Sequence, residues 1–163
     1  MLMLVESDDP YFAQGMPQPR LDPDTRPFWE ACRDHRLLVQ RCADCGAHRS
    51  PPKPVCWRCG SFECAWSESS GRGRVFTYTI AHHCPHLVAQ DRLPYNVAVI
   101  ELEDCDRVLL TSNVVDCPDD ALRVDLLVEV VWEDRRDGQS LYRFRPTTQP
   151  ISDLQPGNPR PTI

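Results

Sequence analysis

The stretch Cys42-Ala-Asp-Cys45-Gly46, followed after nine residues by Cys56-Trp-Arg-Cys59-Gly60, decides the fold of this chain. Each CxxCG pair offers two thiolates, and the glycine after each pair lets the backbone turn so that its amide groups point at the sulfur atoms. Disulfide bonds or simple burial explain this spacing less well than a zinc ribbon does. The sequence therefore predicts that four cysteines bind one tetrahedral metal ion: Cys42, Cys45, Cys56 and Cys59.

The segment between the two cysteine pairs indicates that the ion has a structural role. Residues 49–55 are rich in proline and carry no core pattern, so the metal itself must hold this lobe together. Four protein ligands leave no open position for water or substrate, whereas a catalytic zinc normally keeps one. We expect structural zinc, although four cysteines also satisfy the iron of rubredoxin.

Length and composition predict one compact body with the metal-binding lobe as an appendage, because 163 residues bury one moderate core. The nine cysteines do not indicate a secreted disulfide scaffold, since residues 1–16 lack the basic start and apolar run of a signal peptide. No apolar run approaches the about 20 residues of a membrane-spanning helix. We expect a soluble protein of the reducing cytoplasm that does not bind a membrane.

Charge is unevenly distributed along the chain, whose formal net charge is −6. Residues 33–60 are mainly basic, and residues 101–134 are mainly acidic. A basic ribbon on an acidic body favours a small anionic ligand or a partner at the ribbon, unless both are ordinary solvated faces. The same distribution argues against an extended binding surface for a nucleic acid.

The two ends of the chain have no apolar period. Residues 1–21 and 147–163 are rich in proline and polar residues, which predicts two flexible tails, the first of them disordered or ordered only on a partner. Between the tails, we expect a helical segment at 22–36, a zinc ribbon at 37–66 and a β-barrel at 67–146.

The helical segment carries large aromatic residues that need a surface. Asp24 or Thr25 is suited to cap the helix, and Pro27 is acceptable in its first turn. Phe28 and Trp29 then lie on an apolar side, where they either pack on the body of the chain or anchor a partner subunit.

The barrel segment contains five short patterns rich in β-branched and aromatic residues. Strands are expected at 73–81, 95–102, 107–115, 126–132 and 140–145, with Asp137-Gly138 as the last turn. Five strands with no strong helix among them favour a five-stranded OB-fold barrel, since sandwiches usually have more strands. The predicted fold is therefore mainly β.

The histidine cluster His82-His83-Cys84-Pro85-His86 is the one place that suggests a second metal or a catalytic base. We favour neither, because adjacent ring nitrogens rarely meet one ion and Cys84 has no evident partner to orient an attack. The sequence contains no Gly-rich phosphate loop, GxSxG elbow or dinucleotide fingerprint. No catalytic residue is predicted, and the chain does not look like a self-sufficient enzyme.

Together, these motifs resemble the family of zinc-ribbon and OB-fold proteins associated with acyl-CoA enzymes. Besides the two cysteine pairs, the resemblance rests on segments between residues 22 and 146 that stand in family order: Arg26-Pro-Phe-Trp-Glu30, Leu37-Leu-Val-Gln-Arg-Cys42, Pro51-Pro52, Gly71-Arg-Gly-Arg-Val75, Pro94-Tyr95, Asn113-Val-Val-Asp116 and Arg143-Phe-Arg-Pro146. It implies an N-terminal helical segment, a rubredoxin-like zinc ribbon and a C-terminal OB-fold barrel. The chain departs from the family at Glu103-Asp-Cys-Asp-Arg107 and at Asp125, where relatives usually turn with glycine.

The resemblance also implies a function. Such proteins are non-catalytic subunits that dock on thiolase-like enzymes, as hetero-oligomers, and support carbon–carbon bond cleavage or formation on CoA thioesters. Retro-aldol cleavage in steroid side-chain degradation is one such reaction, and an enoyl-CoA hydratase is a further implied partner. The CoA thioester is the expected ligand of the complex. Phe28, Trp29 and Trp57 are then candidates for binding the partner, and Arg49, Arg72 and Arg74 for binding the CoA phosphates.

Two other functions remain open. An OB barrel with a ribbon also suits a single-stranded nucleic-acid binder, but such binders need a basic groove with aromatic platforms, and this body is acidic. A free-standing acyl-CoA hydrolase using the histidine cluster would be active as a single chain and would lose activity on His83→Ala.

Overall fold

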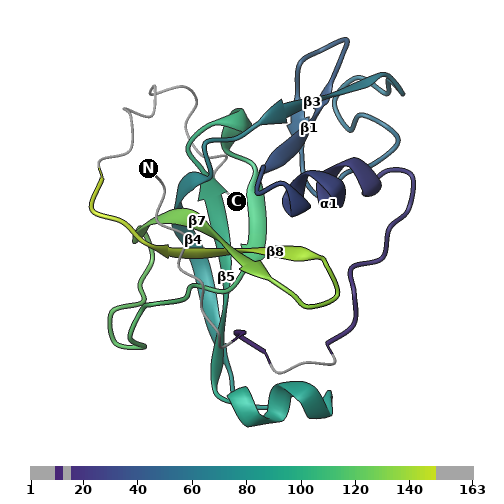
Figure 1. Cartoon of the computed structure of the whole chain (residues 1–163). Coiled ribbons are helices and arrows are strands. Elements are labelled where there is room, and N and C mark those ends of the chain that lie inside the picture. The colour runs from purple at the N-terminus through teal and green to yellow at the C-terminus, as the bar shows by residue number, and fades with distance from the viewer. Residues whose placement is uncertain (1–9, 13–15, 150–163) are drawn as a thin grey trace.

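The structure, a computed structural model, describes residues 10–12 and 16–149 and is mainly β (Figure 1). Two sheets and one α-helix make up most of the described chain. The elements are α1 (Arg26–Arg33), β1 (Leu38–Cys42), β2 (His48–Arg49), β3 (Cys64–Glu68), β4 (Arg72–Ala81), η1 (Leu87–Arg92), β5 (Tyr95–Leu102), η2 (Cys105–Arg107), β6 (Leu109–Ser112), β7 (Leu127–Asp134) and β8 (Ser140–Pro146). In this part of the chain, no helix has the length and apolar character that crossing a membrane requires.

The zinc-ribbon segment forms a three-stranded antiparallel sheet in the order β2-β1-β3. The register places Cys64 of β3 opposite Cys42 at the end of β1. The first cysteine pair therefore begins where a paired strand ends, which fixes its direction relative to the sheet.

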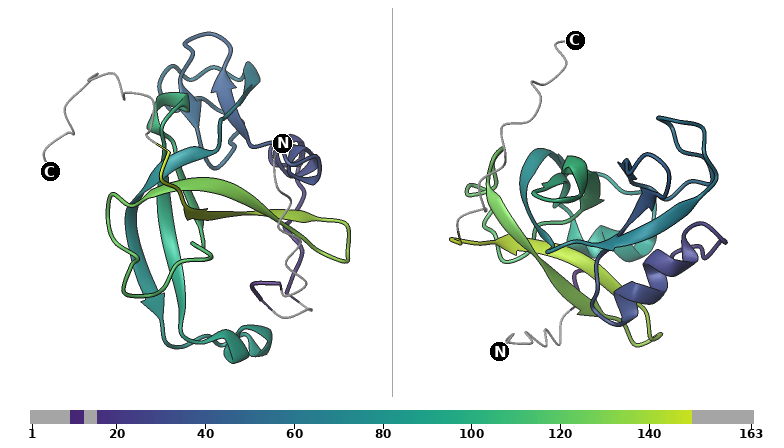
Figure 2. Two further views of the ribbon diagram at one scale, coloured as in Figure 1. Left: turned by 60° about the vertical axis from the view of Figure 1, so that its left-hand side comes forward. Right: turned by 90° about the horizontal axis from the view of Figure 1, so that it is seen from above.

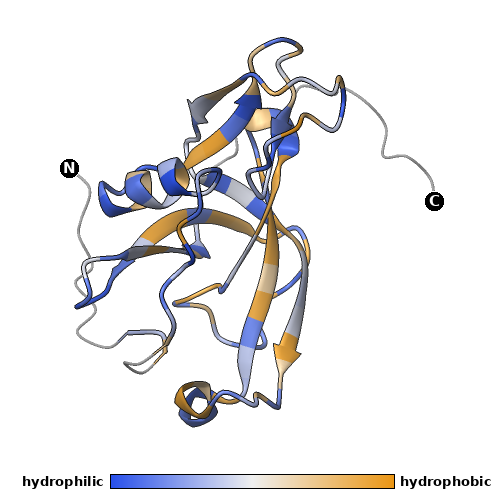
Figure 3. Cartoon of the chain, turned by 90° about the vertical axis from the view of Figure 1, so that its right-hand side faces the viewer, coloured by the Kyte–Doolittle hydropathy of each residue, from blue (hydrophilic) through white to orange (hydrophobic). Residues whose placement is uncertain are grey.

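The second sheet has the order β6-β5-β4-β7-β8, with every neighbouring pair antiparallel. A parallel bridge between Val114 and Phe144 closes it, supported by a hydrogen bond of 2.7 Å from the Val115 amide to the Phe144 carbonyl. A curled five-stranded sheet whose third and fifth strands meet in parallel is an OB fold, so the predicted fold is confirmed. Figure 3 shows apolar and polar residues following one another along these strands.

One hydrophobic core joins the helix, the ribbon and the barrel. Leu37 and Val39 from the ribbon belong to the same buried cluster as Phe144 and Ile100 of the barrel. Helix α1 packs against β1 and β8 and buries Phe28 in this cluster (Figure 2). The ribbon is therefore seated on the barrel by shared apolar packing, which is the main stabilising term in folding.

The β4–β5 hairpin extends beyond the body of the barrel and carries η1 near its tip (Figures 1 and 2). The side chains of His82, His83 and His86 are exposed in this loop. The four ribbon cysteines are the one group of three or more metal-binding side chains that the described residues bring close enough to share an ion. The histidine cluster does not form such a site.

The predicted tails lie largely outside the described residues, which exclude 1–9, 13–15 and 150–163. Of the first predicted tail, residues 10–12 and 16–21 are described. Tyr11 and Phe12 pack against barrel residues, and Arg135 binds the carbonyl groups of Met16 and Pro17.

Candidate metal centre and ribbon–barrel junction

The four predicted ligands converge at one end of the ribbon. The Sγ atoms of Cys42 and Cys59 lie 3.6 Å apart, as do those of Cys45 and Cys56, and all four lie within 4.8 Å of one another. Four bonds of about 2.3 Å to a tetrahedral zinc ion would place sulfur atoms about 3.8 Å apart. The donor set therefore fits zinc in both chemistry and spacing.

The backbone around the cysteines favours the thiolate form that binds a metal. Gly46 and Gly60 have φ of +74° and +75°, and each amide donates a hydrogen bond to the carbonyl of the first cysteine in its pair. Hydrogen bonds from the amides of Cys45 and Asp44 lower the pKa of the Cys42 thiol. The corresponding amides of Cys59 and Arg58 lower the pKa of Cys56 to about 6. The backbone of Ser61 acts in the same direction on Cys59, but hydrogen bonds with the neighbouring thiols raise the pKa of Cys59 to about 12. Metal binding therefore displaces fewer protons at Cys42 and Cys56 than at Cys59 at neutral pH.

The three aromatic candidates for partner binding are found in different environments. Phe28 is 7% exposed and lies in the core, so it packs on the body of the chain. Trp29 is half-buried and stacks on Tyr142 at 6.0 Å between ring centroids. Trp57 is 75% exposed in the second cysteine pair.

Two further exposed apolar residues flank the second cysteine pair. Phe62 is 72% exposed and Val55 is 41% exposed. Neither is among the site residues predicted from the sequence, although a lobe without a core of its own has little apolar surface in which to bury them. We call Val55, Trp57 and Phe62 the knuckle patch.

The three arginines predicted to bind CoA phosphates are engaged within the chain. Arg49 is 6% exposed; its Nε donates to Gln40 Oε1 at 2.6 Å, and its two Nη atoms are buried without a hydrogen-bond partner in the described structure. Arg72 Nε lies 3.5 Å from Glu103, and Arg74 Nε lies 2.7 Å from Glu101. These arginines therefore do not form an open phosphate site in this structure.

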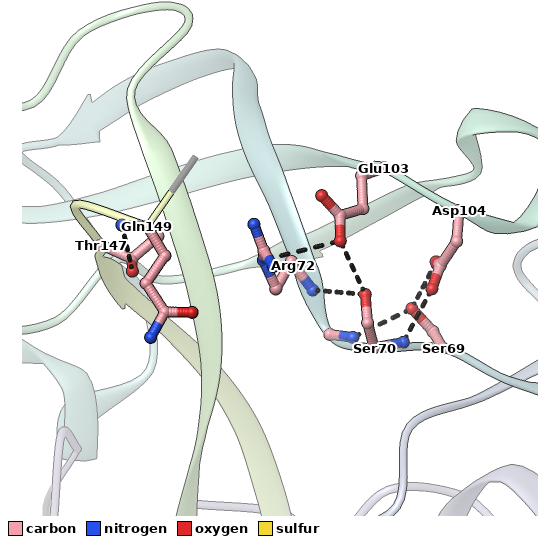
Figure 4. Close-up of polar contacts among 8 residues, drawn as sticks. Ser69, Ser70, Arg72, Glu103, Asp104, Thr147 and Gln149 are labelled. Carbon is pink, nitrogen blue, oxygen red and sulfur yellow. Dashed lines mark hydrogen bonds and ion pairs between the residues drawn. The ribbon is translucent and has the colours of Figure 1, made fainter. Parts of the chain in front are cut away.

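The turn that departs from the family pattern forms the junction between ribbon and barrel. Asp104 accepts hydrogen bonds from Ser69 Oγ at 2.6 Å and from the Ser70 amide at 2.7 Å, and Glu103 accepts one from Ser70 Oγ (Figure 4). Asp106 accepts a hydrogen bond of 3.2 Å from the amide of His48 in β2. Residues of one barrel turn thus bind both the segment between β3 and β4, at Ser69 and Ser70, and the ribbon strand β2.

This turn adopts a backbone conformation that glycine would adopt more readily. Cys105, Asp106 and Arg107 have φ of 56°, 56° and 59°, which is the left-handed region. Such conformations are costly for residues with a side chain and persist when surrounding contacts require them. Here the contacts include the ion pair of 2.7 Å between Arg107 and the buried Glu101.

Ser67, His48 and Asp106 are connected in the order of a hydrolase triad. Ser67 Oγ lies 3.1 Å from His48 Nε2, and His48 Nδ1 lies 2.9 Å from Asp106 Oδ2. In a catalytic triad the carboxylate is buried behind the histidine, whereas the Asp106 side chain is 64% exposed and that of His48 only 14%. The accessibility is therefore the reverse of a triad, and the three residues link β2, β3 and the barrel turn.

Replacement of Asp106 by Asn is expected to reduce stability slightly, by less than about 1 kcal/mol, because the carboxylate is largely exposed. A hydrogen bond with the His48 ring, and a second from the His48 amide, lower the pKa of Asp106 below its ordinary value of 3.8. The stabilisation by the charged form is therefore complete above that value and is lost as pH falls through the lowered folded pKa. Thermal unfolding of both proteins as the buffer is acidified measures this, with Glu63→Gln as an exposed control on the ribbon. If the stability difference between the unaltered protein and Asp106→Asn does not shrink in acid, the charged carboxylate of Asp106 is not the source of the stabilisation.

A four-cysteine ribbon joined to an OB barrel defines the class of this molecule as a zinc-ribbon and OB-fold protein. Residues 29–63 match the domain family described as "ChsH2, rubredoxin-like zinc ribbon domain", and residues 66–133 match "ChsH2, C-terminal OB-fold domain". The chain belongs to the ChsH2 (DUF35) family.

Proteins similar to this chain include complex subunits and scaffold proteins. The 3-oxo-4,17-pregnadiene-20-carboxyl-CoA hydratase alpha subunit of Mycobacterium tuberculosis is 38% identical over 132 residues, which is 81% of this chain and 40% of that protein. A DUF35 domain-containing scaffold protein of Methanocaldococcus jannaschii is 32% identical over 72% of this chain and 85% of its own length. A chain of the solved Ltp2-ChsH2(DUF35) aldolase has a TM-score of 0.71 and 36% identity, covering 79% of this chain and 98% of that one.

Proposed function

We propose that this chain is a non-catalytic subunit that docks on a thiolase-like enzyme and supports carbon–carbon bond cleavage or formation on CoA thioesters. The observation that carries the proposal is the likeness to a chain of the Ltp2-ChsH2(DUF35) aldolase, which extends over 98% of that chain. The four-cysteine metal centre, with no open coordination position, supports a structural rather than a catalytic role.

The finer substrate class that we propose is the CoA thioester of a steroid side chain, cleaved by a retro-aldol reaction. Its support is the name of the Mycobacterium tuberculosis relative, a pregnadiene carboxyl-CoA hydratase alpha subunit. The same name supports an enoyl-CoA hydratase as a second partner. This chain spans about 40% of the length of that relative, so the hydratase activity of the whole relative is not part of the proposal.

The knuckle patch is the surface that we propose for docking. Trp57 and Phe62 are large, exposed and apolar, and aromatic residues of this kind supply most of the binding energy at protein interfaces. Lys53 and Arg58 lie in the same loop and second cysteine pair. The patch therefore suits an apolar depression with an acidic border on the enzyme.

The central test is co-expression of this chain with the thiolase-like enzyme of its own organism. We expect the two to co-elute and the release of the cleaved carbonyl product from the CoA thioester to require both. Trp57→Ala combined with Phe62→Ala should weaken the complex at least about 10-fold, a change of about 1.4 kcal/mol. Leu87→Ala is the matched control, because Leu87 is as exposed as Trp57 but lies on the β4–β5 hairpin. Full activity of the enzyme without this chain would overturn the proposal.

Two contacts bear on the alternative functions. Barrel arginines are paired with carboxylates, as in Arg143 with Glu133 and Arg145 with Glu129, both at 2.8 Å, which argues against a basic track for single-stranded nucleic acid. A variant tests the hydrolase alternative. The complex with the thiolase-like enzyme should keep its activity on the CoA thioester after His83→Ala, whereas a hydrolase built on the histidine cluster would lose its activity.

A further inference from the structure

The barrel has a pocket of about 310 Å³ next to the start of its second strand. β5 and β6 are the second and third strands of this barrel, and the pocket lies between the start of β5, the segment after β6, and strands β7 and β8. Its lining includes Tyr95, Val114, Trp132 and Arg143. This combination of aromatic, aliphatic and arginine side chains suits an aromatic guest.

The N-terminal part of the chain places an aromatic residue at the edge of this pocket. Tyr11 forms one wall of the pocket, with Arg92 Cζ 4.9 Å and Arg143 Cζ 5.4 Å from the centre of its ring. Burial raises the pKa of the Tyr11 hydroxyl, which is hydrogen-bonded to the backbone of Asn96. The phenol is therefore held at both its ring and its hydroxyl.

Phe12 extends the same arrangement by one residue. Its ring packs edge-to-face on Tyr95 at 4.9 Å between centroids, and Arg143 Cζ lies 5.7 Å from its centre. A single guanidinium thus contacts both adjacent rings. Arg135 binds the carbonyl groups of Met16 and Pro17, at 2.6 Å and 3.3 Å, and holds a second point of the N-terminal segment.

The barrel fixes Arg143 independently of the two aromatic residues. Arg143 Nε donates to Glu133 Oε2 at 2.8 Å and Nη1 donates to Asn113 Oδ1 at 2.9 Å, and its side chain is 12% exposed. A guanidinium whose plane is set by barrel residues offers a prepared surface for stacking of aromatic rings. Arg143 is therefore positioned by the barrel alone, and Tyr11 and Phe12 bind to a guanidinium that is already in place.

We propose that the barrel surface formed by Arg92, Tyr95 and Arg143 at the edge of this pocket is a binding site for two adjacent aromatic side chains on an extended peptide. Tyr11 and Phe12 of the same chain are its resident occupants. The N-terminal segment then covers this barrel surface. A peptide that takes the same contacts with Arg143 and Tyr95 must displace this segment. The assignment does not depend on the enzyme on which the chain docks.

The test uses the full chain with Tyr11→Ala and Phe12→Ala, and as probe a fluorescein-labelled peptide with the sequence of residues 8–20. Fluorescence anisotropy should show saturable binding to the double variant and at least about 10-fold weaker binding to the unaltered chain, because a tethered segment competes at high effective concentration. Adding Arg143→Ala to the double variant should abolish binding, as should replacing both aromatic residues of the peptide by alanine.

A matched control is Phe76→Ala, which removes an aromatic residue 39% exposed on β4 outside the pocket lining and should leave the chain as closed to the peptide as before. Should the double variant unfold, Tyr11→Ala alone is measured in the same way. Equal binding to the unaltered chain and the variant, or no binding to either, would overturn the proposal. So would a concentration-dependent dimer that is lost on Tyr11→Ala, because the occupant would then come from a second copy.

Discussion

Replacing Cys42 with serine is expected to remove the metal and unfold the ribbon. The lobe around the metal centre has a buried cluster of only Cys42, Ala47 and Cys56, with Cys45 packed against it. No apolar core of useful size remains once the ion is lost, and structural zinc typically contributes about 10 kcal/mol or more to the folding of such lobes. Metal content should fall to background, and amide hydrogen exchange should show loss of protection from Cys42 to Cys64. Binding to the thiolase-like enzyme should be lost with it.

The matched control is Cys64→Ser. Cys64 is exposed, lies opposite Cys42 in the β1–β3 register and is not one of the four clustered cysteines. We expect this variant to keep its metal and its fold, whereas Cys59→Ser should behave like Cys42→Ser. A Cys42→Ser protein that retains zinc and a protected ribbon would contradict the structural role. A red, iron-loaded protein before substitution would contradict zinc.

The metal centre and the strands could be predicted because their signals are local. The two CxxCG pairs determine which sulfur atoms meet, since each pair forms its own turn and the loop between them is short. The strand predicted at 95–102 is the observed β5, where a proline precedes a run of β-branched and apolar residues. The strand predicted at 107–115 is shorter, because Arg107 belongs to η2 and Val114 leaves the sheet order to form the closing parallel bridge.

The burial of individual aromatic residues depended on contacts that the sequence does not reveal. Phe28 packs edge-to-face on Tyr142, which comes from the last barrel strand, and is therefore part of the core. Tyr11 and Phe12 lie in a segment that composition alone predicts to be flexible. Their ordering depends on Arg92 and Arg143, which come from distant parts of the chain.

The ribbon–barrel junction was unpredictable for the same reason. His48 and Asp106 are separated by 58 positions, and no periodic pattern connects them. At Glu103-Asp-Cys-Asp-Arg107 the sequence indicates only a turn that lacks the glycine usual in relatives. In the structure its carboxylates also position the ribbon, and Arg107 pairs with the buried Glu101.

Gly73→Ala is expected to destabilise the barrel strongly, although it adds a single methyl group. A Cβ atom at Gly73 would lie 2.3 Å from the carbonyl oxygen of Glu101, which is backbone and cannot move aside as a side chain does. Gly73 is paired with Leu102 in the β4–β5 register, so the clash would separate the central strands next to the junction turn. We expect a loss of about 3 kcal/mol or more and a fall in Tm of about 10 °C.

Gly138→Ala separates this clash from the general cost of replacing glycine. Gly138 lies in the β7–β8 turn with φ of +79°, and a Cβ atom added there would meet no other atom within 4 Å, so only backbone strain of about 1 kcal/mol is expected. Urea unfolding followed by tryptophan fluorescence compares the two variants at unchanged m value. Equal urea midpoints for Gly73→Ala and Gly138→Ala would show that the added methyl group at Gly73 is accommodated without loss of stability. A much lower midpoint for Gly73→Ala would show that the close approach of β4 to β5 at Glu101 stabilises the barrel next to the 103–107 turn, which contacts the ribbon.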